Sequence, residues 1–340
     1  MGILISYIQA KYLDCREVID LKYELIIYHG GNAYFPIVID DITLTAELRG
    51  SPETLEFTVL KDNLLNFVEG DSVSFKVDGK KIFYGFVFTK KRDKDQRISV
   101  VAYSQIRYLK NKDTIVYTNK TASDLVRMIA NDYQLNLGTI EDTGYAIPKK
   151  IEDGTTLIDI IQNAIDETVL MTGTIYVLYD DYGRLCLRSL QSLGTDVLID
   201  SGTAENFDYS SSIDEETFNK IKLSYKNDET GKRDIYIVQD TDKINEWGVL
   251  QYYETIDKSV KNPIARANGL LKRYNYKTRR LEIKGAFGHL SVRGGSIISV
   301  ALNLGDIIIQ NRMVVQTVKH RFTEGNHSMD LVVKGGVIQG

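Results

Sequence analysis

The sequence predicts a mainly β, α+β fold with two small β-barrel domains, an α/β domain between them and a helical insertion. Three observations predict it. Residues 69–88 read as a β-hairpin, and a second Gly-Asp pair at Gly305-Asp306 again precedes a strand-like apolar run. Between residues 111 and 200 the apolar residues instead recur at helical spacing. The chain is therefore expected to hold one small β-module twice, separated by a unit of another type.

The hairpin is the strongest local signal. Alternating apolar residues on each side flank Asp78-Gly79, a pair that favours the tight reversal between two strands. A region opened by Gly305-Asp306, with apolar runs at 307–309 and 313–315, is its counterpart. The residues that we assign to structural turns in the two regions are Gly70, Asp71, Gly79, Gly85, Gly305 and Asp306.

Residues 1–110 are expected to form the first β-barrel domain. Short segments rich in Val, Ile, Phe and Tyr are separated by Gly, Asp or Asn turns, which is typical of a small barrel or sandwich. The expected strands cover residues 21–27, 42–48, 55–60, 73–77, 82–89 and 98–103.

Residues 111–200 are expected to form the α/β domain. Thr121 suits the start of a helix, with Asp124 at the capping-box position, and a second helix begins at Thr155 or Thr156 and ends near Gly173. The apolar stripes of both helices indicate core packing. A hairpin follows at 174–188, with its turn in the segment Asp-Asp-Tyr-Gly.

Residues 201–240 and 281–340 are expected to form the second β-barrel domain, which the helical insertion 241–280 interrupts. Asn262-Pro263 places a capping residue before a proline at the first helical position, so a short helix is predicted there. Strands are expected at 219–225, 233–238, 280–284, 297–300, 305–309, 313–320 and 329–333.

Composition narrows the function. A chain of 340 residues suggests two to four domains. A net charge of -4 argues against a dedicated nucleic-acid binder held by phosphate contacts. The 21 tyrosines fit a protein with many strands and large protein interfaces. The apolar runs are too short for a membrane helix, and residues 1–6 match a myristoylation pattern but also alternate as a strand does.

Motifs for catalysis and metal binding are missing from the sequence. The chain has no phosphate-binding loop, nucleophile elbow or zinc-binding helix, and Cys15 and Cys186 are isolated thiols that fit a reducing compartment. His320, His327 and Asp330 are weak metal candidates beside the last turn, although two turn-flanking histidines explain them as well. We therefore expect no metal and no cofactor.

Charged residues gather in several short clusters. The acidic clusters at 40–41, 180–181 and 214–216 are expected to be solvated turns and not a catalytic site, because glycoside hydrolysis needs two carboxyls held across a groove. The candidate partner-contact patch is basic and consists of Lys272, Arg273, Arg279 and Arg280. Aromatic residues among these cations suit nucleic acid, whereas cations at a helix C-terminus also suit the helix dipole or an acidic partner.

The order of these elements resembles a known family. Gly70-Asp71-Ser72-Val73 with 84–87, the hairpin 175–187, and the segments 314–322 and 327–331 together resemble tail hub proteins, the baseplate hubs of contractile phage tails and phage-tail-like particles. These include the hubs of PBSX-like prophages, late-control D proteins and the hub part of VgrG spikes. The resemblance covers nearly the whole chain.

The resemblance implies a non-enzymatic virion or phage-tail-like component, assembled in the bacterial cytoplasm without a signal peptide. It implies a homotrimeric ring with pseudo-sixfold symmetry, formed from two tube-type barrels per chain, that joins a hexameric tail tube to a trimeric central spike. Its partners would be the tail tube protein, the spike, baseplate wedge proteins and the tape-measure protein, with nucleic acid at most passing through the lumen.

Some hubs of this family carry fused hydrolase domains, but Gly340 follows the final expected strand closely, so we expect none here. The alternative function is a cell-wall-binding or cell-wall-degrading tail enzyme, which the many tyrosines and acidic turns would suit.

Overall fold

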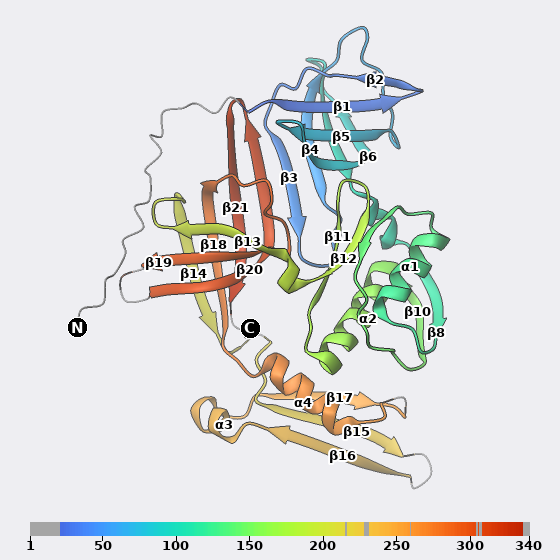
Figure 1. Cartoon of the computed structure of the whole chain (residues 1–340), viewed down its shortest axis with the longest axis vertical. Helices are drawn as coiled ribbons and strands as arrows, with labels where there is room; N and C mark the ends of the chain where they lie inside the picture. The colour runs from blue at the N-terminus through green and yellow to red at the C-terminus, as the bar shows by residue number, and fades with distance from the viewer. Residues whose placement is uncertain are drawn as a thin grey trace, which may run out of the picture.

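The computed structural model describes residues 21–214, 216–227, 231–258, 260–303, 305 and 308–335. Strands account for 51% of the residues and helices for 18%, which confirms the mainly β class. Figure 1 shows two β-modules, a middle unit of helices and short strands, and a small sheet that lies apart from the other strands. Cys15, Glu215, Asp306 and the myristoylation pattern fall outside the described residues.

The first module is a curved sheet around one apolar core. Its strands follow the order β3-β4-β7-β6-β5-β1-β2. They are β1 (Tyr23–His29), β2 (Asn32–Tyr34), β3 (Ile42–Glu47), β4 (Thr54–Leu60), β5 (Ser72–Val77), β6 (Lys80–Arg92) and β7 (Arg97–Tyr103). Phe75, Phe83 and Leu55 are buried in the core.

The predicted hairpin is confirmed as β5 and β6. Asp78 and Gly79 connect the two strands with φ of 49° and 74°, the left-handed pair that a two-residue hairpin turn requires. Gly85 lies within β6 rather than at a turn. It faces Val73, and a Cβ there would lie 2.3 Å from the carbonyl oxygen of Tyr103, so close packing explains this glycine.

The second module repeats this strand order as β14-β18-β21-β20, with β19 and β13 following beside β20. Its strands are β13 (Gly194–Asp200), β14 (Asn206–Ser212), β18 (Thr278–Phe287), β19 (Ile297–Asn303), β20 (Ile308–Thr323) and β21 (Asn326–Gly335). Its separate core contains Leu281, Val318 and Met329. Thus β3, β4, β7, β6 and β5 correspond to β14, β18, β21, β20 and β19.

The correspondence extends to individual hydrogen bonds. The Gly70 amide donates to the Val87 carbonyl at 2.8 Å, and the Val87 amide donates to the Asp71 carbonyl at 2.8 Å. In the second module Gly295 donates to Val315 at 2.8 Å, and Val315 donates to Ser296 at 2.9 Å. Each long strand then shifts register against the next strand, between Val87 and Thr89 and between Val315 and Thr317.

The counterpart of Gly70 is therefore Gly295. The sequence had suggested Gly305 instead. Gly70 and Gly295 have φ of 93° and 89°, and each precedes the first strand of a hairpin. Gly305, at φ 95°, instead lies in the connection between β19 and β20. The sequence misled because Gly295 is followed by serine, whose hydroxyl accepts from the Arg293 amide at 3.0 Å as Asp71 accepts from the Val68 amide at 2.6 Å.

The two modules share one continuous sheet. The second half of β20 leaves β19 and pairs antiparallel with β3, from Thr317 opposite Glu47 to Phe322 opposite Ile42. In the part of the chain that the structure describes, the ladders remain open and no barrel closes, so the two closed barrels that we expected are not confirmed.

The middle unit confirms both predicted helices. Thr121 caps α1 (Ala122–Asp132) in a capping box with Asp124, and Thr156 caps α2 (Leu157–Thr172), which ends at Gly173 with φ 76°. The unit also contains β8 (Lys112–Tyr117), β9 (Leu137–Ile140), β10 (Lys150–Thr156), β11 (Tyr176–Asp180) and β12 (Leu185–Ser189), with short 3-10 helices at Gln105–Lys110 and Leu190–Leu193. The hairpin β11–β12 is the one predicted at 174–188.

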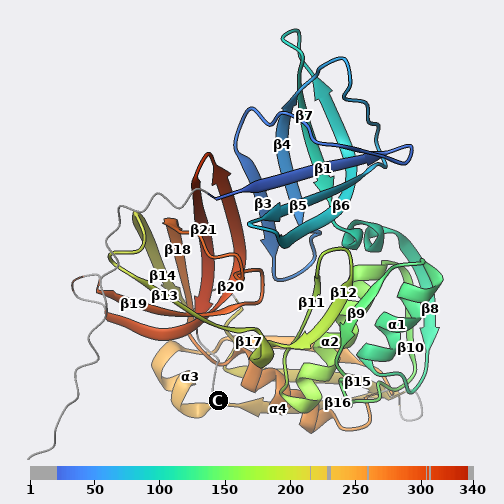
Figure 2. The same ribbon diagram turned by 45° about the horizontal axis from the view of Figure 1, so that its top comes forward.

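The small sheet is a separate three-stranded layer in the order β16-β15-β17. β15 (Lys220–Asn227) and β16 (Lys232–Gln239), which we expected in the second barrel, pair with each other here, and β17 (Gln251–Ile256) pairs parallel with the other edge of β15. In sequence, α3 (Thr241–Trp247) lies between β16 and β17. The helix α4 (Pro263–Tyr274), capped by Asn262 as predicted, packs on β15 and β16. Figure 2 shows this layer below the middle unit.

One ion-pair cluster joins the small sheet to the middle unit. Arg266 of α4 contacts Glu167 of α2 at 2.7 Å and Glu254 of β17 at 2.9 Å, with its side chain 13% exposed. The division of the chain into four domains with the boundaries given above stays a prediction. None of the helices among the described residues is both long and apolar enough to cross a membrane.

Candidate functional site

The predicted basic patch lines a groove of about 530 Å³ between α2, α4 and the second module. Lys272 and Arg273 come from the last turn of α4, where cations interact favourably with the negative end of the helix dipole. Arg279 comes from the start of β18. Arg49 and Lys334 add two further cations. Arg280 does not reach the groove; its guanidinium pairs with Glu282 at 2.9 Å.

Carboxylates neutralise part of this groove. Asp166 contacts Arg49 at 3.0 Å and Arg273 at 3.5 Å, and Glu216 contacts Lys334 at 3.6 Å. Tyr274 and Tyr276 also line the groove. The structure therefore brings together three of the four predicted patch residues, in a mixed wall that suits an acidic protein segment better than a continuous phosphate backbone.

The two candidate metal ligands on the last hairpin do meet. His320 Nδ1 lies 2.9 Å from His327 Nε2, and His320 Nε2 lies 2.9 Å from the carbonyl oxygen of Val292. A carbonyl only accepts, so His320 Nε2 carries a proton and donates to it, and His327 Nε2 donates to the unprotonated His320 Nδ1. Both rings are neutral in this arrangement.

Burial explains their neutrality. Loss of solvent lowers the pKa of His320 to about 4 and the pKa of His327 to about 3. Asp330 does not join them: it faces Lys319 across the ladder, and its Oδ1 accepts from the Gly285 amide at 3.0 Å. Among the described residues no group of three or more potential metal ligands lies together. In this structure the two rings are partners in a hydrogen bond.

A carboxyl cluster that sequence reasoning missed lies where the first module meets the middle unit. Burial raises the pKa of Glu53 and of Asp180, while the nearby Arg293 guanidinium opposes the shift. Asp180 is 2% exposed, so the expectation of a solvated turn was wrong for it. The Asp180-Asp181 pair was the available signal, but the sequence does not place it beside Arg293, 113 residues away, whose guanidinium donates to the Asp180 carbonyl oxygen at 3.1 Å.

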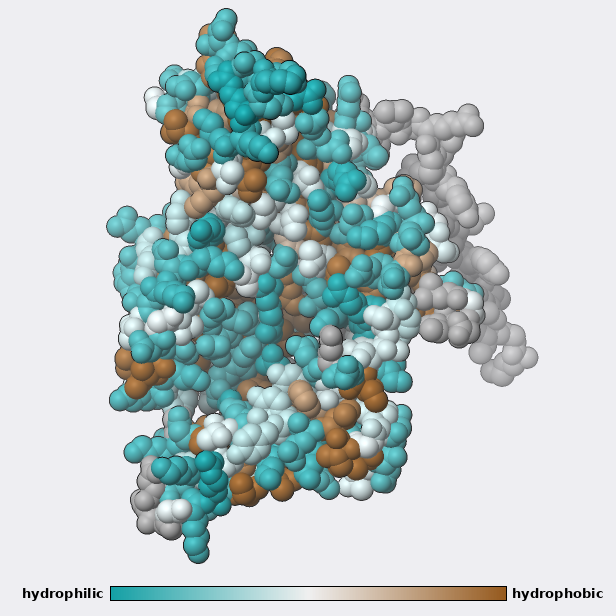
Figure 3. Space-filling model, turned by 180° about the vertical axis from the view of Figure 1, so that it is seen from behind, coloured by the Kyte–Doolittle hydropathy of each residue, from teal (hydrophilic) through white to brown (hydrophobic). Residues whose placement is uncertain are grey.

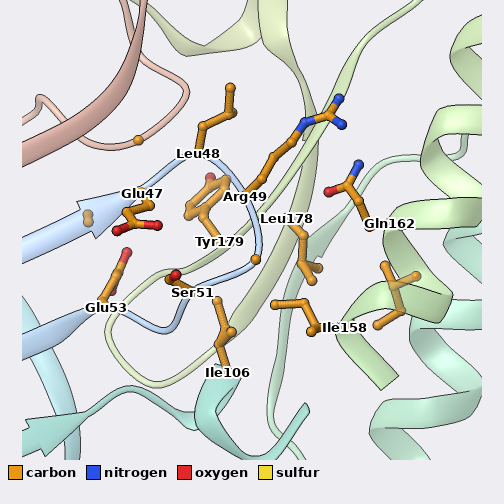
Figure 4. Close-up of a pocket in the computed structure, with 14 residues that line it drawn as sticks. Glu47, Leu48, Arg49, Ser51, Glu53, Ile106, Ile158, Gln162, Leu178 and Tyr179 are labelled. Atoms are coloured by element: carbon orange, nitrogen blue, oxygen red, sulfur yellow. The ribbon is translucent and has the colours of Figure 1, made fainter. Parts of the chain in front are cut away.

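The space beside this cluster is small. Figure 4 shows Glu47, Glu53, Ser51 and Tyr179 around a cavity of about 20 Å³, which is room for one water molecule and far too little for a sugar. Figure 3 shows a mostly hydrophilic surface on the face seen from behind, with apolar residues in separate small patches. Neither feature is a binding cleft for a polysaccharide.

Comparison with known proteins gives consistent matches over most of the chain. The model of the YQBQ-like family matches residues 42–334. The uncharacterized protein YqbQ of Bacillus subtilis is 28% identical over 318 residues, covering 90% of this chain and 96% of that protein. The phage-like element PBSX protein XkdQ of the same organism is 29% identical, with the same coverage.

Solved structures share the fold at low sequence identity. The prophage MuSo2 43 kDa tail protein from Shewanella oneidensis superposes with a TM-score of 0.65 at 13% identity, covering 91% of this chain and 98% of that one. The Escherichia coli c3393 protein, described as a component of the type VI secretion system similar to the T4 tail proteins gp27 and gp5, has a TM-score of 0.57 at 11% identity, covering 93% of this chain and 77% of that one.

Proposed function

Because this chain belongs to the YQBQ-like family, with a PBSX prophage protein among its relatives and the fold of phage tail proteins, we propose that it is a structural baseplate hub of a contractile tail. In this proposal three copies form a ring with pseudo-sixfold symmetry. The ring joins a hexameric tail tube on one side to a trimeric central spike on the other.

One observation carries the proposal: the two modules repeat the same strand order, hydrogen bonds and register shift. Two equivalent modules in each of three chains present six similar units, and six units match a hexameric ring. A trimer of a chain without this repeat offers only three. The repeat therefore supports the role of a symmetry adaptor.

The proposed partners follow from this role. The tube protein and the spike occupy the two sides of the ring, wedge proteins surround it, and the tape-measure protein reaches its lumen. The groove lined by Lys272, Arg273 and Arg279 is the proposed contact for an acidic surface of one of these proteins. The particle would be assembled in the bacterial cytoplasm.

A non-enzymatic role is also the better proposal for Glu53 and Asp180, the two carboxyls whose pKa burial raises. Glu53 borders a space for a single water molecule and Asp180 is 2% exposed, so a cell-wall polymer would not reach them. The test of the alternative is incubation of the purified chain with peptidoglycan. Release of soluble fragments would favour the tail enzyme over the hub.

The oligomeric state tests the hub directly. Light scattering should give three times the chain mass of 38.5 kDa, which is about 115 kDa, and electron micrographs should show a ring. The measurement is made on the chain alone and after co-expression with its neighbouring tail genes. A chain that stays monomeric in both preparations overturns the proposal.

A further inference from the structure

We propose that neighbouring copies of this chain join by antiparallel pairing of β6 with β14, in the register that β20 and β3 use inside one chain. This inference rests on the proposed ring and identifies the two strands that meet where neighbouring chains of the ring touch. Inside the chain, β20 of the second module pairs with β3 of the first. The counterparts of these strands are β6 and β14, and they belong to opposite modules as well.

Both counterpart strands have a free edge. β14 pairs only with β18 among the described strands, and the second half of β6 pairs only with β7. Asp93 donates to Arg97 at 3.0 Å across the β6–β7 ladder, so the alternation of an antiparallel pair turns the amides of Lys90 and Arg92 away from β7. The same edge of β20 is the one that β3 occupies.

The register follows position by position from the two modules. Val87 faces Ala102 and Val315 faces Val333, which aligns Thr89, Lys91 and Arg92 with Thr317, Lys319 and His320. Leu44 faces Leu55 as Tyr209 faces Leu281, which aligns β3 with β14. Lys319 faces Thr45 and His320 faces Leu44 inside the chain. The pairs between chains are therefore Lys91 with Ser210 and Arg92 with Tyr209.

The side chains suit this register. Tyr209 is half-buried against the second core, and Arg92 would come to lie beside its ring. Lys91 and Ser210 are both exposed on the outer face. Asp208 stands diagonal to Lys91 on that face, within reach of an opposite charge. A cationic edge thus meets an edge with one acid and several serines.

The contact between chains must differ from the internal one at one end. Gly294 packs so closely on β3 that a Cβ there would lie 2.3 Å from the Glu47 carbonyl carbon, and its counterpart in the first module is Glu69. The Glu69 side chain would push the strands apart near Thr89 and Ser212. The closest pairing is therefore expected at Lys91 and Ser210, away from Glu69.

This pairing uses the free edges of β6 and β14 to close the ring. Each chain supplies one internal β20–β3 contact and one β6–β14 contact to a neighbour. Three chains then alternate three internal with three external contacts, so six equivalent steps complete one turn. A head-to-tail contact of this kind closes into a ring when its rotation divides the circle.

The experiment is a disulfide between chains. The Leu48 amide donates to the Gln316 carbonyl at 2.8 Å, so Thr45 and Lys319, three positions along the ladder, are a pair without hydrogen bonds, whose Cβ atoms lie closest. The equivalent double variant is Lys91→Cys/Ser210→Cys. Both positions are exposed, so folding should be preserved. The control is Lys91→Cys/Ser211→Cys, because a one-residue slip points the thiol to the other face.

Under mild oxidation, non-reducing gels of Lys91→Cys/Ser210→Cys should show a covalent trimer, while the control and the single variants should not. A trimer by light scattering with no link at this pair, or equal linking in the control, overturns the register but leaves the hub proposal standing. A monomer by light scattering overturns both. A covalent species that stops at dimer overturns the closure of the ring through this contact.

Discussion

Thr317 of β20 lies opposite Glu47 of β3, and this register joins the two modules of the chain into one sheet. The pairing runs to Phe322 opposite Ile42, with Phe322 packed in the core of the first module. The junction thus has the hydrogen bonds of a sheet and a shared apolar core. Domains joined in this way should move as one body, which suits an adaptor that holds two symmetric partners in fixed positions.

The junction is sensitive to the residue at Gly294. An added Cβ would lie 2.3 Å from the Glu47 carbonyl carbon and 2.5 Å from the Leu48 amide nitrogen, and backbone atoms cannot yield easily. Gly294→Ala should therefore lower the free energy of unfolding by about 1 to 3 kcal/mol, measured by urea denaturation. Gly202→Ala is the control, because its nearest contact is an ordinary 3.4 Å to Asp200. Equal stability of the two variants would contradict the close contact.

A proline scan of β6 should separate folding from assembly. The Arg92 amide points away from β7, whereas the Lys91 amide points toward it and faces Ser99. Arg92→Pro should leave the thermal midpoint nearly unchanged but reduce the trimer to monomer by light scattering. Lys91→Pro should cost about 3 kcal/mol of stability, because a ladder hydrogen bond is lost. A trimer that survives Arg92→Pro would speak against the β6–β14 contact.

Charge reversal tests the basic groove. Lys272→Glu/Arg279→Glu changes two cations of the groove, and Arg280→Glu/Lys284→Glu changes two nearby cations that do not line it. The first variant should lose co-purification with its tail partner by tenfold or more while the second retains it. Because the groove is neutralised in part by Asp166 and Glu216, DNA retention should be weak for the parent chain at physiological salt.

The sequence predicts local features well in this chain. Asp78-Gly79, the Thr121 capping box, Gly173 at a helix end and Asn262-Pro263 each act through neighbours in sequence, and each was confirmed. The Gly-Asp pair at Gly305 misled because the true counterpart, Gly295, repeats the backbone hydrogen bonds of Gly70 without a following aspartate. Either Asp or Ser after the glycine accepts the hydrogen bond from the amide three residues before it.

Features set by distant contacts could not be predicted. β15 and β16 looked like barrel strands because alternation fixes a strand but not its partner. The strands β13 and β14 were missed, since their positions alternate mostly between exposed and half-buried and leave few buried apolar residues to mark a strand. The burial of Asp180 and the contact between His320 and His327 likewise depend on tertiary packing.

Two arginines offer a comparison of buried and exposed ion pairs. Arg266, 13% exposed, contacts Glu167 and Glu254, whereas Arg280, 46% exposed, contacts Glu282 alone. Arg266→Ala should destabilise the chain by about 3 kcal/mol, because two carboxylates lose their partner in a poorly hydrated site. Arg280→Ala should change stability by at most about 1 kcal/mol. Urea denaturation measures both, and similar losses would show that Arg266 does not join α4 to α2 as described.

The buried histidines predict a loss of stability in acid. Their pKa values in the folded chain, about 4 for His320 and about 3 for His327, lie below the ordinary value of 6.5. The unfolded chain therefore takes up protons first as the pH falls below about 6.5, which favours unfolding, and the stabilisation is present in full only above that pH. A tenfold difference in proton affinity between the folded and unfolded chain corresponds to about 1.4 kcal/mol of stability.

Between pH 7 and pH 4.5 the midpoint of thermal unfolding should fall for the parent chain. His320→Gln/His327→Gln should be less stable at pH 7 but should flatten this part of the profile, because no imidazole remains to be protonated. The difference between the parent slope and the variant slope removes the contribution of the other titrating groups, which both chains share. An identical pH profile for parent and variant would mean that the pair takes up its protons equally in both states, which its burial beneath Gly288 and Val292 argues against.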